Sequence, residues 1–187
     1  MKIGLTQRVL HFNNVDYDCT EHGWYEMLEG HTLVSIANDP EQDFSKLVDS
    51  LDLVIITGGD ASPKRLLTEV RLLTECYQKN TAMLGVCHGA LFINQMEDGT
   101  NFACENHWGT EHPIIMEGQK HIVNSFHDNS IVKVAESCDP IALSEEGDVE
   151  AFKHKTRPVW GVMWHPERQE QATLPLAVKA ILNQYKS

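Results

Sequence analysis

Leu84-Gly85-Val86-Cys87-His88-Gly89-Ala90 joins an apolar strand-like run to an apolar segment that continues as a helix. A Gly-x-Cys-x-Gly sequence at such a junction is typical of a nucleophile elbow, a sharp strand-to-helix turn whose central side chain projects outward. The flanking glycines let neighbouring segments approach closely. The segment therefore predicts a sheet strand, a tight turn carrying Cys87, and a helix.

Strand-like runs and helical patterns alternate before this turn. The strand-like runs are Lys2–Thr6, Thr32–Ile36, Leu51–Thr57 and Ala82–Val86, and the helical patterns are Thr20–Glu29, Asp43–Asp49 and Pro63–Lys79. Repeated strand–helix–strand units favour right-handed crossovers and a parallel sheet. We therefore expect a three-layer α/β fold of the flavodoxin or Rossmann type, with a central, mostly parallel sheet and helices on both faces.

The composition changes between Gly99 and Trp164, and this stretch is rich in Asn, His and Gly. Short β-like runs at Ile114–Met116, Ile131–Val134 and Val159–Met163 predict hairpins and loops appended to the sheet. A final amphipathic helix is expected at about Leu174–Tyr185. The chain shows no internal repeat or linker, so we expect one domain spanning residues 1–187.

Composition excludes several classes of partner. The 187-residue chain has 27 acidic and 15 basic side chains and a formal net charge of −12. This charge repels phosphate backbones and anionic lipid, so we expect no nucleic-acid or membrane partner, and an anionic substrate would need a local positive pocket. No apolar run approaches the roughly 18 residues of a membrane-spanning helix. The opening residues are too short and polar a run for a signal peptide, and we expect a cytoplasmic protein.

A second motif supplies what a cysteine nucleophile needs. Trp160–Glu167 ends an apolar run with His165, Pro166 and Glu167. The proline biases His165 toward an extended conformation, in which residues i and i+2 project to the same side. Taken alone, Cys87 could be a small buried hydrophobe and His-Pro-Glu a strand-ending turn. Together they predict a triad of nucleophile, base and orienting carboxylate.

Paired glycines follow the third strand-like run, in Ile56-Thr57-Gly58-Gly59-Asp60. At the carboxyl end of a parallel strand such glycines present backbone amides to the crevice in which open α/β sheets bind ligands. The amides of Gly59 and His88 are therefore candidates for an oxyanion hole. A plain tight turn is the alternative interpretation of the glycines.

These segments together resemble the class I glutamine amidotransferase superfamily, and within it the γ-glutamyl hydrolase (peptidase C26) branch. The resemblance covers nearly the whole chain. It rests on the oxyanion loop, the elbow, the His-Pro-Glu segment, the stretch Val123-Asn124-Ser125-Phe126-His127, and the pair Arg65 and Glu69.

The resemblance implies a mechanism and a set of roles. Cys87 would attack a γ-glutamyl amide and form a thioester, His165 would relay protons, and Glu167 would orient His165. No metal or organic cofactor is implied. The substrate would be a small γ-glutamyl compound, and the residues expected beside its glutamyl group are Gly58, Asn124, Ser125, Phe126 and His127.

Two features bear on ligands. Many glutaminases of this superfamily carry Gln four residues after the nucleophile, where this chain has Leu91, and this substitution affects recognition of free glutamine. The five cysteines form no Cys-x-x-Cys pair, and the histidines of the irregular segment show no recognisable ligand spacing, so we expect no metal site. Those histidines are His107, His112, His121 and His127.

Three functions are compatible with these sequence features. The first is a free-standing γ-glutamyl amide hydrolase, because residues 3–8 and Trp24-Tyr25 resemble bacterial members that cleave γ-glutamyl-CDP-amidate. That reaction releases glutamate and cytidine diphosphoramidate for capsule or surface polysaccharide modification. The second is a glutaminase subunit that passes ammonia to a synthetase partner through an apolar docking face around its active site. The third is a non-catalytic binding relative.

Overall fold

The computed structural model describes residues 1–104 and 108–184. The strands are β1 (Lys2–Thr6), β2 (Arg8–Phe12), β3 (Val15–Cys19), β4 (Thr32–Ile36), β5 (Leu53–Ile56), β6 (Ala82–Val86), β7 (Thr100–Ala103), β8 (Trp108–Met116), β9 (Gln119–Phe126), β10 (Asn129–Lys133), β11 (Cys138–Ser144), β12 (Val149–His154) and β13 (Val159–Val162). The helices are α1 (Gly23–Met27), α2 (Ser45–Asp49), α3 (Pro63–Lys79), α4 (His88–Met96), α5 (Leu176–Asn183) and the short 3₁₀ helix η1 (Pro166–Arg168). Within the described ranges, no helix has the length and hydropathy needed to span a bilayer.

A parallel core lies at one end of the sheet, with strand order β4-β1-β5-β6-β13. All residues of β5 and the last four of β6 are buried. Strands covered on both faces have apolar residues at successive positions rather than at alternate ones, which is how these two strands read. The predicted parallel sheet is confirmed.

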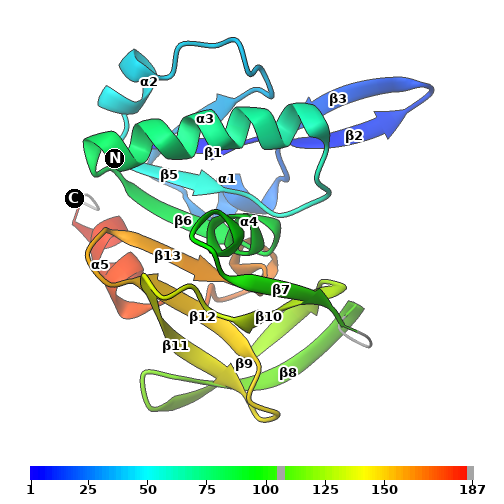
Figure 1. The fold of residues 1–187 in the computed structure, drawn as a ribbon, viewed down its shortest axis with the longest axis vertical. Coiled ribbons are helices and arrows are strands. Elements are labelled where there is room, and N and C mark those ends of the chain that lie inside the picture. The colour runs from blue at the N-terminus through cyan, green and yellow to red at the C-terminus, as the bar shows by residue number, and fades with distance from the viewer. Residues whose placement is uncertain (105–107, 185–187) are drawn as a thin grey trace.

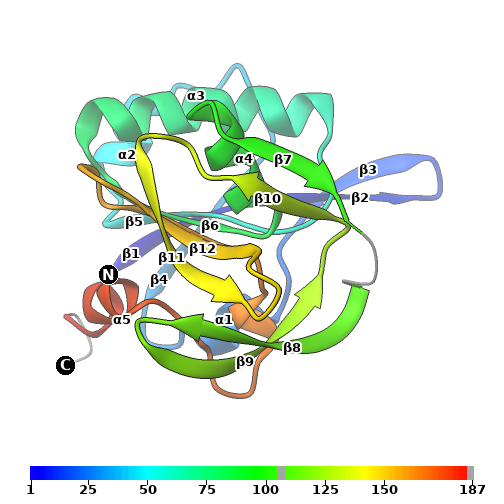
Figure 2. The same ribbon diagram turned by 60° about the horizontal axis from the view of Figure 1, so that its bottom comes forward.

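Helices cover both faces of this core, as Figures 1 and 2 show. Trp24 of α1 and Val178 of α5 belong to one buried apolar cluster, together with residues of β1, β5 and β6. Leu72 of α3 and Ile93 of α4 belong to a second cluster, formed with the alternate residues of β5 and β6. Because neighbouring strand residues point to opposite faces, one set of strands serves both clusters. The predicted three-layer arrangement is confirmed.

Helix α3 has the bounds that its sequence predicts. Ser62 is its N-cap, and the Oγ of Ser62 accepts a hydrogen bond from the Arg65 amide at 3.3 Å. Pro63 occupies the first turn, where a missing N–H costs nothing. Asn80 ends the helix in the left-handed conformation with φ 54°. Helix α5 spans less than the expected 174–185, and Tyr185 lies outside the described residues.

The appended hairpins extend the same sheet by antiparallel pairing. Strand β12 pairs with β13, and the order continues β12-β11-β8-β9. The sequence grouped Val159–Met163 with this appended region, but β13 is the last strand of the parallel core and pairs with β6. A short apolar run looks the same in either position, because its sequence does not reveal which strand it pairs with.

A hairpin of β2 and β3 forms a separate two-stranded sheet and projects from the body of the molecule (Figure 1). The sequence did not predict it. Asn13 and Asn14 connect the strands with φ values of 52° and 61°. A two-residue turn with positive φ at both positions favours asparagine or glycine, so Asn-Asn is the signal that could have revealed the hairpin.

Parallel register brings distant segments together at one edge of the sheet. Val162 of β13 lies opposite Val86 of β6. The Cys87 amide continues this pairing and donates a hydrogen bond to the Val162 carbonyl at 2.8 Å. The residues that follow β5, β6 and β13 therefore all leave the sheet at the same edge, where open α/β sheets place their ligand sites.

The buried face of α3 provides a test of the fold. Leu72 is 0% exposed and Leu67, on the same helix, is 59% exposed. We expect Leu72→Ala to lower the free energy of unfolding by about 2–5 kcal/mol, because it leaves a cavity between α3 and the sheet. Leu67→Ala is the matched control and should change it by less than about 0.5 kcal/mol. Equilibrium unfolding in urea measures both, and equal losses would contradict the described packing.

Candidate active site

Cys87 lies between β6 and α4, at the N-cap of the helix. Its φ of 50° and ψ of −105° lie outside the regions that non-glycine residues favour, a conformation that costs about 1–3 kcal/mol. A Cβ at Gly89 would collide with the Ile56 carbonyl, so only glycine lets α4 begin this close to β5. The thiol is nearly buried at a helix N-terminus, where the helix dipole favours an anion.

His165 and Glu167 form a buried pair just beyond β13. The ring of His165 hydrogen-bonds through Nδ1 to the Oε1 of Glu167 at 2.7 Å. His165 precedes Pro166 and has an extended backbone with φ −103° and ψ 92°, as a residue before proline prefers. Glu167 lies in the short helix η1. An imidazole held in this way has its tautomer and orientation set by the carboxylate.

The surroundings of His165 favour its protonated form. Burial by itself would lower the pKa of His165, but hydrogen bonds with Cys87 and Glu167 and the negative charge of both partners raise it to about 9. The imidazole is therefore protonated at neutral pH. The thiolate is the nucleophilic form of cysteine, and positively charged neighbours generally favour that form.

Arg65 holds the loop that follows β5. Its side chain is fully buried and donates from Nη2 to the Thr57 carbonyl at 2.6 Å. Its Nη1 donates to the carbonyls of Gly58 and Asp60, each at 3.2 Å. One guanidinium thus binds three carbonyl oxygens of residues 57–60. This fixes the backbone of the glycine loop from the side of α3.

Glu69 links this loop to the elbow. Its Oε1 accepts from Arg65 Nε at 2.8 Å, and its Oε2 lies 2.7 Å from His88 Nε2. Burial by itself would raise the pKa of Glu69, but hydrogen bonds from His88 and Arg65 and their charges lower it below the usual value. A buried ionised carboxylate paired on both oxygens is rigid, so the two backbone segments expected to form an oxyanion hole are tied together.

A cavity of about 240 Å³ opens beside the cysteine. The sequence-predicted site residues that line it are Cys87, His165, Gly59, His88, Phe126 and His127. Pockets for drug-sized ligands usually measure about 300–1,000 Å³, so this cavity is smaller than those pockets.

The other sequence-predicted residues, all within the described ranges, lie behind the cavity wall and support it. The Asn124 side chain accepts from the His165 amide and donates to the His165 carbonyl, both at 2.8 Å. Ser125 Oγ lies 3.0 Å from His127 Nε2. Gly58 packs against the His165 ring, and a Cβ there would collide with Cε1. Gly58, Asn124 and Glu167 therefore all act on the position of His165.

The cavity wall also contains two arginines that no sequence motif indicated. Arg8 lies at the start of β2 and Arg168 at the end of η1. Both bind Glu21, at 3.3 Å for Arg8 Nη1 and at 2.6 Å for Arg168 Nε. Two guanidinium groups share one carboxylate, and Asp60 and Asp128 line the same cavity, so the wall carries charges of both signs. Only the position of Arg168 directly after His-Pro-Glu could have signalled its role.

This fold and this arrangement of residues match known proteins. A sequence profile of the family "Glutamine amidotransferase class-I" matches residues 25–180. The chain therefore belongs to the class I glutamine amidotransferase family and is an amide-bond hydrolase.

Individual relatives agree with this assignment. A γ-glutamyl-CDP-amidate hydrolase from Campylobacter jejuni is 32% identical, over 90% of this chain and 91% of its own. The carbamoyl phosphate synthase small chain of Aquifex aeolicus is 27% identical over 62% of this chain and 33% of its own. The crystal structure of a glutamine amidotransferase from Thermotoga maritima superposes with a TM-score of 0.72 at 13% identity, covering 99% of this chain and 82% of that one, and shows the shared fold.

The contact between Gly58 and His165 can be tested by adding one methyl group. We expect Gly58→Ala to lower kcat by about 100-fold, because the displaced imidazole no longer meets the thiol at the right distance. Gly118→Ala, in the turn between β8 and β9, is the control for a general loss of stability, because a side chain is strained at its φ of 79° although no atom lies within 4 Å. Steady-state kinetics should show full activity in the control, and thermal melting compares the stability of the two variants. Unchanged kcat in Gly58→Ala would contradict the packing.

Proposed function

We propose that this protein hydrolyses a γ-glutamyl amide bond through a Cys87–His165–Glu167 triad and a γ-glutamyl thioester. The observation that carries the proposal is that Cys87 and His165 line one cavity while Glu167 holds the far side of the imidazole at 2.7 Å. These are the three chemical groups that cysteine-dependent amide hydrolysis requires, in the order that it requires them.

In the first half of the reaction, the Cys87 thiolate attacks the γ-carbonyl carbon and forms a C–S bond. The negative charge moves to the carbonyl oxygen, which the amides of Gly59 and His88 stabilise. One such donor contributes about 3–4 kcal/mol to the transition state. The C–N bond then breaks, and the His165 imidazolium gives its proton to the departing nitrogen.

In the second half, water attacks the carbonyl carbon of the thioester. Neutral His165 accepts a proton from this water and returns to the imidazolium form. A second oxyanion forms at the same amides, the C–S bond breaks, and glutamate and the Cys87 thiolate are released. Glu167 keeps the imidazole oriented through both halves and stabilises its positive charge.

The cavity wall suits a glutamyl group. Phe126 lies edge-on to the His165 ring, with 5.9 Å between ring centres, and the Arg168 guanidinium lies over Phe126 at 4.7 Å. We propose that the glutamyl group is positioned by Gly58, Asn124, Ser125, Phe126 and His127. Backbone atoms of β9 would contact the group, and side chains behind the cavity wall would hold that backbone in place. Leu91 on the same wall gives free glutamine no polar contact at that position.

The preferred substrate in this proposal is γ-glutamyl-CDP-amidate, in surface polysaccharide biosynthesis in the cytoplasm. Support comes from the 32% identity to the Campylobacter jejuni enzyme over nearly the whole of both chains. It also comes from Arg8 and Arg168, which place positive charge at the cavity of a protein whose net charge is −12. A diphosphate leaving group extending past the glutamyl group would meet these arginines.

A second candidate function is that of a glutaminase subunit serving a synthetase. Trp108 lines the cavity yet is 72% exposed. Exposed aromatic side chains at an active-site mouth favour a protein interface. The relative from Aquifex aeolicus is the small chain of a synthase, which agrees with this alternative.

Glutamate release from a panel of substrates tests the proposal. We expect the purified chain to cleave a γ-glutamyl nucleoside diphosphoramidate faster than glutamine, without a second protein. Cys87→Ala should lower kcat by about 10⁴-fold or more, and a γ-glutamyl adduct on Cys87 should appear in the mass spectrum of rapidly quenched wild-type enzyme. Cys138→Ala, a buried cysteine on β11, is the matched control. Turnover that depends on an added synthetase would favour the second candidate, and turnover by Cys87→Ala would sink the triad.

The raised pKa of His165 predicts the alkaline limb of the pH profile. The imidazolium donates a proton to the leaving nitrogen, so kcat/KM should fall as pH rises through about 9. Glu167→Gln removes a charge that raises this pKa, and we expect the limb to move to lower pH by ~1 unit or more. The exposed Glu170→Gln is the control and should leave the profile in place. A limb that moves upward or stays fixed in Glu167→Gln contradicts the assignment.

A further inference from the structure

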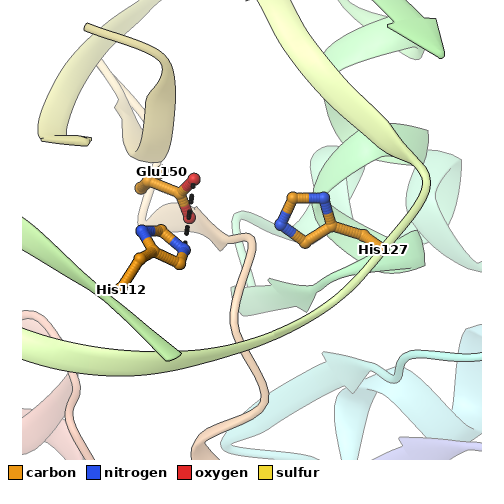
Figure 3. Close-up of side chains that lie close together, drawn as sticks. All are labelled: His112, His127 and Glu150. Atoms are coloured by element: carbon orange, nitrogen blue, oxygen red, sulfur yellow. Dashed lines mark ion pairs between the residues drawn. The ribbon is translucent and has the colours of Figure 1, made fainter. Parts of the chain in front are cut away.

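Two histidines and a glutamate converge in the antiparallel half of the sheet, as Figure 3 shows. His112 lies on β8, Glu150 lies on β12, and His127 directly follows β9. One ligand atom of each side chain lies within 4.8 Å of those of the other two. His112 Nε2 and Glu150 Oε1, joined by the dashed line, are 3.7 Å apart. Three separate segments thus bring nitrogen and oxygen atoms to one small volume.

The carboxylate of this cluster is buried without full compensation. Glu150 is 2% exposed and His127 is 4% exposed. Oε2 of Glu150 has no hydrogen-bond partner among the described residues. A buried carboxylate is costly unless a cation or several hydrogen bonds balance its charge. Asp148 and Glu146 add further negative charge near this carboxylate.

The donor set has a known chemical preference. Two imidazole nitrogens and one carboxylate oxygen are the protein ligands of many zinc sites, with water or a further group in fourth position. Bonds of that kind place ligand atoms about 3.4 Å apart in a tetrahedral site. The distance of 3.7 Å between His112 Nε2 and Glu150 Oε1 is close to this value, and all three ligand atoms lie within 4.8 Å of one another.

We propose that His112, His127 and Glu150 bind a divalent transition-metal ion of the zinc type. The site lies outside the Cys87–His165–Glu167 group and does not rest on the proposed function. No spacing pattern in the sequence indicates this site, because the ligands come from two strands and from the residue that follows a third. His127 follows His112 by 15 positions in the sequence, and Glu150 follows His127 by 23.

Neighbouring groups hold the ring of His127 in place. Ser125 Oγ lies 3.0 Å from its Nε2, and Cys104 Sγ lies 3.8 Å from its Nδ1. Metal-bound histidines are commonly oriented by a polar neighbour on the other ring nitrogen, and such neighbours tune affinity.

The ion would fasten the antiparallel half of the sheet to the catalytic cavity. It would join β8, β12 and the segment after β9, and His127 also lines the cavity. Zinc in a site of this kind stabilises the folded chain because it binds the native arrangement and not the unfolded one. The expected role is therefore structural, with an effect on the cavity through the position of His127.

Zinc binding tests the inference directly. The experiment uses Cys87→Ala protein, so that the catalytic thiol and His165 do not themselves capture zinc. After treatment with EDTA the protein is titrated with ZnCl₂ by calorimetry and then melted at increasing zinc concentration. We expect one zinc ion per chain and a rise in Tm of about 5–10 °C when free zinc reaches 100 times Kd.

Variants of the ligands locate the site. In the same background, His112→Ala and Glu150→Gln should each weaken zinc binding by at least ~100-fold and abolish most of the rise in Tm. His121→Ala, on β9 but outside the cluster, should retain both. Glu150→Gln keeps the side-chain volume and carries the test if His112→Ala does not fold. Absence of binding up to millimolar zinc, or zinc binding by both ligand variants as tight as that of the Cys87→Ala background, overturns the proposal. Neither readout uses hydrolase activity.

Discussion

Strands β6 and β13 run parallel, with Val86 opposite Val162, and both end at the same edge of the sheet. The hydrogen bond from the Cys87 amide to the Val162 carbonyl continues this pairing into the elbow. A slip of one residue would turn every side chain of β13 to the other face. The meeting of Cys87 with His165 therefore depends on this register, which the apolar residues of both strands fix because both faces are buried.

The buried pair of Arg65 and Glu69 turns this meeting into a rigid site. Arg65 binds carbonyls of the glycine loop, while Glu69 binds His88 of the elbow. An ion pair at 0% exposure contributes little net stability, because desolvation of both charges offsets their attraction. Its value lies in geometry: five donors of one guanidinium and two oxygens of one carboxylate hold two backbone segments in a single arrangement.

The antiparallel half of the sheet supplies the other wall of the cavity. Asn124 of β9 binds the backbone of His165 on both sides, and Phe126 packs against its ring. The proposed cation site joins this half to the cavity through His127. Arg8 and Arg168 line the same space together with Asp60 and Asp128, so an acidic protein offers an anion two guanidinium groups at this cavity.

The sequence by itself determined the parallel core, the bounds of α3 and the elbow around Cys87, because local rules govern them: apolar runs, an N-cap at Ser62 and glycines at a tight turn. It also singled out His-Pro-Glu, since a proline and a two-residue spacing act locally. Only the tertiary structure decided the partner of β13, the arginines of the cavity and the convergence of His112 with Glu150. These depend on strand pairing between segments far apart in the chain, which no local pattern records.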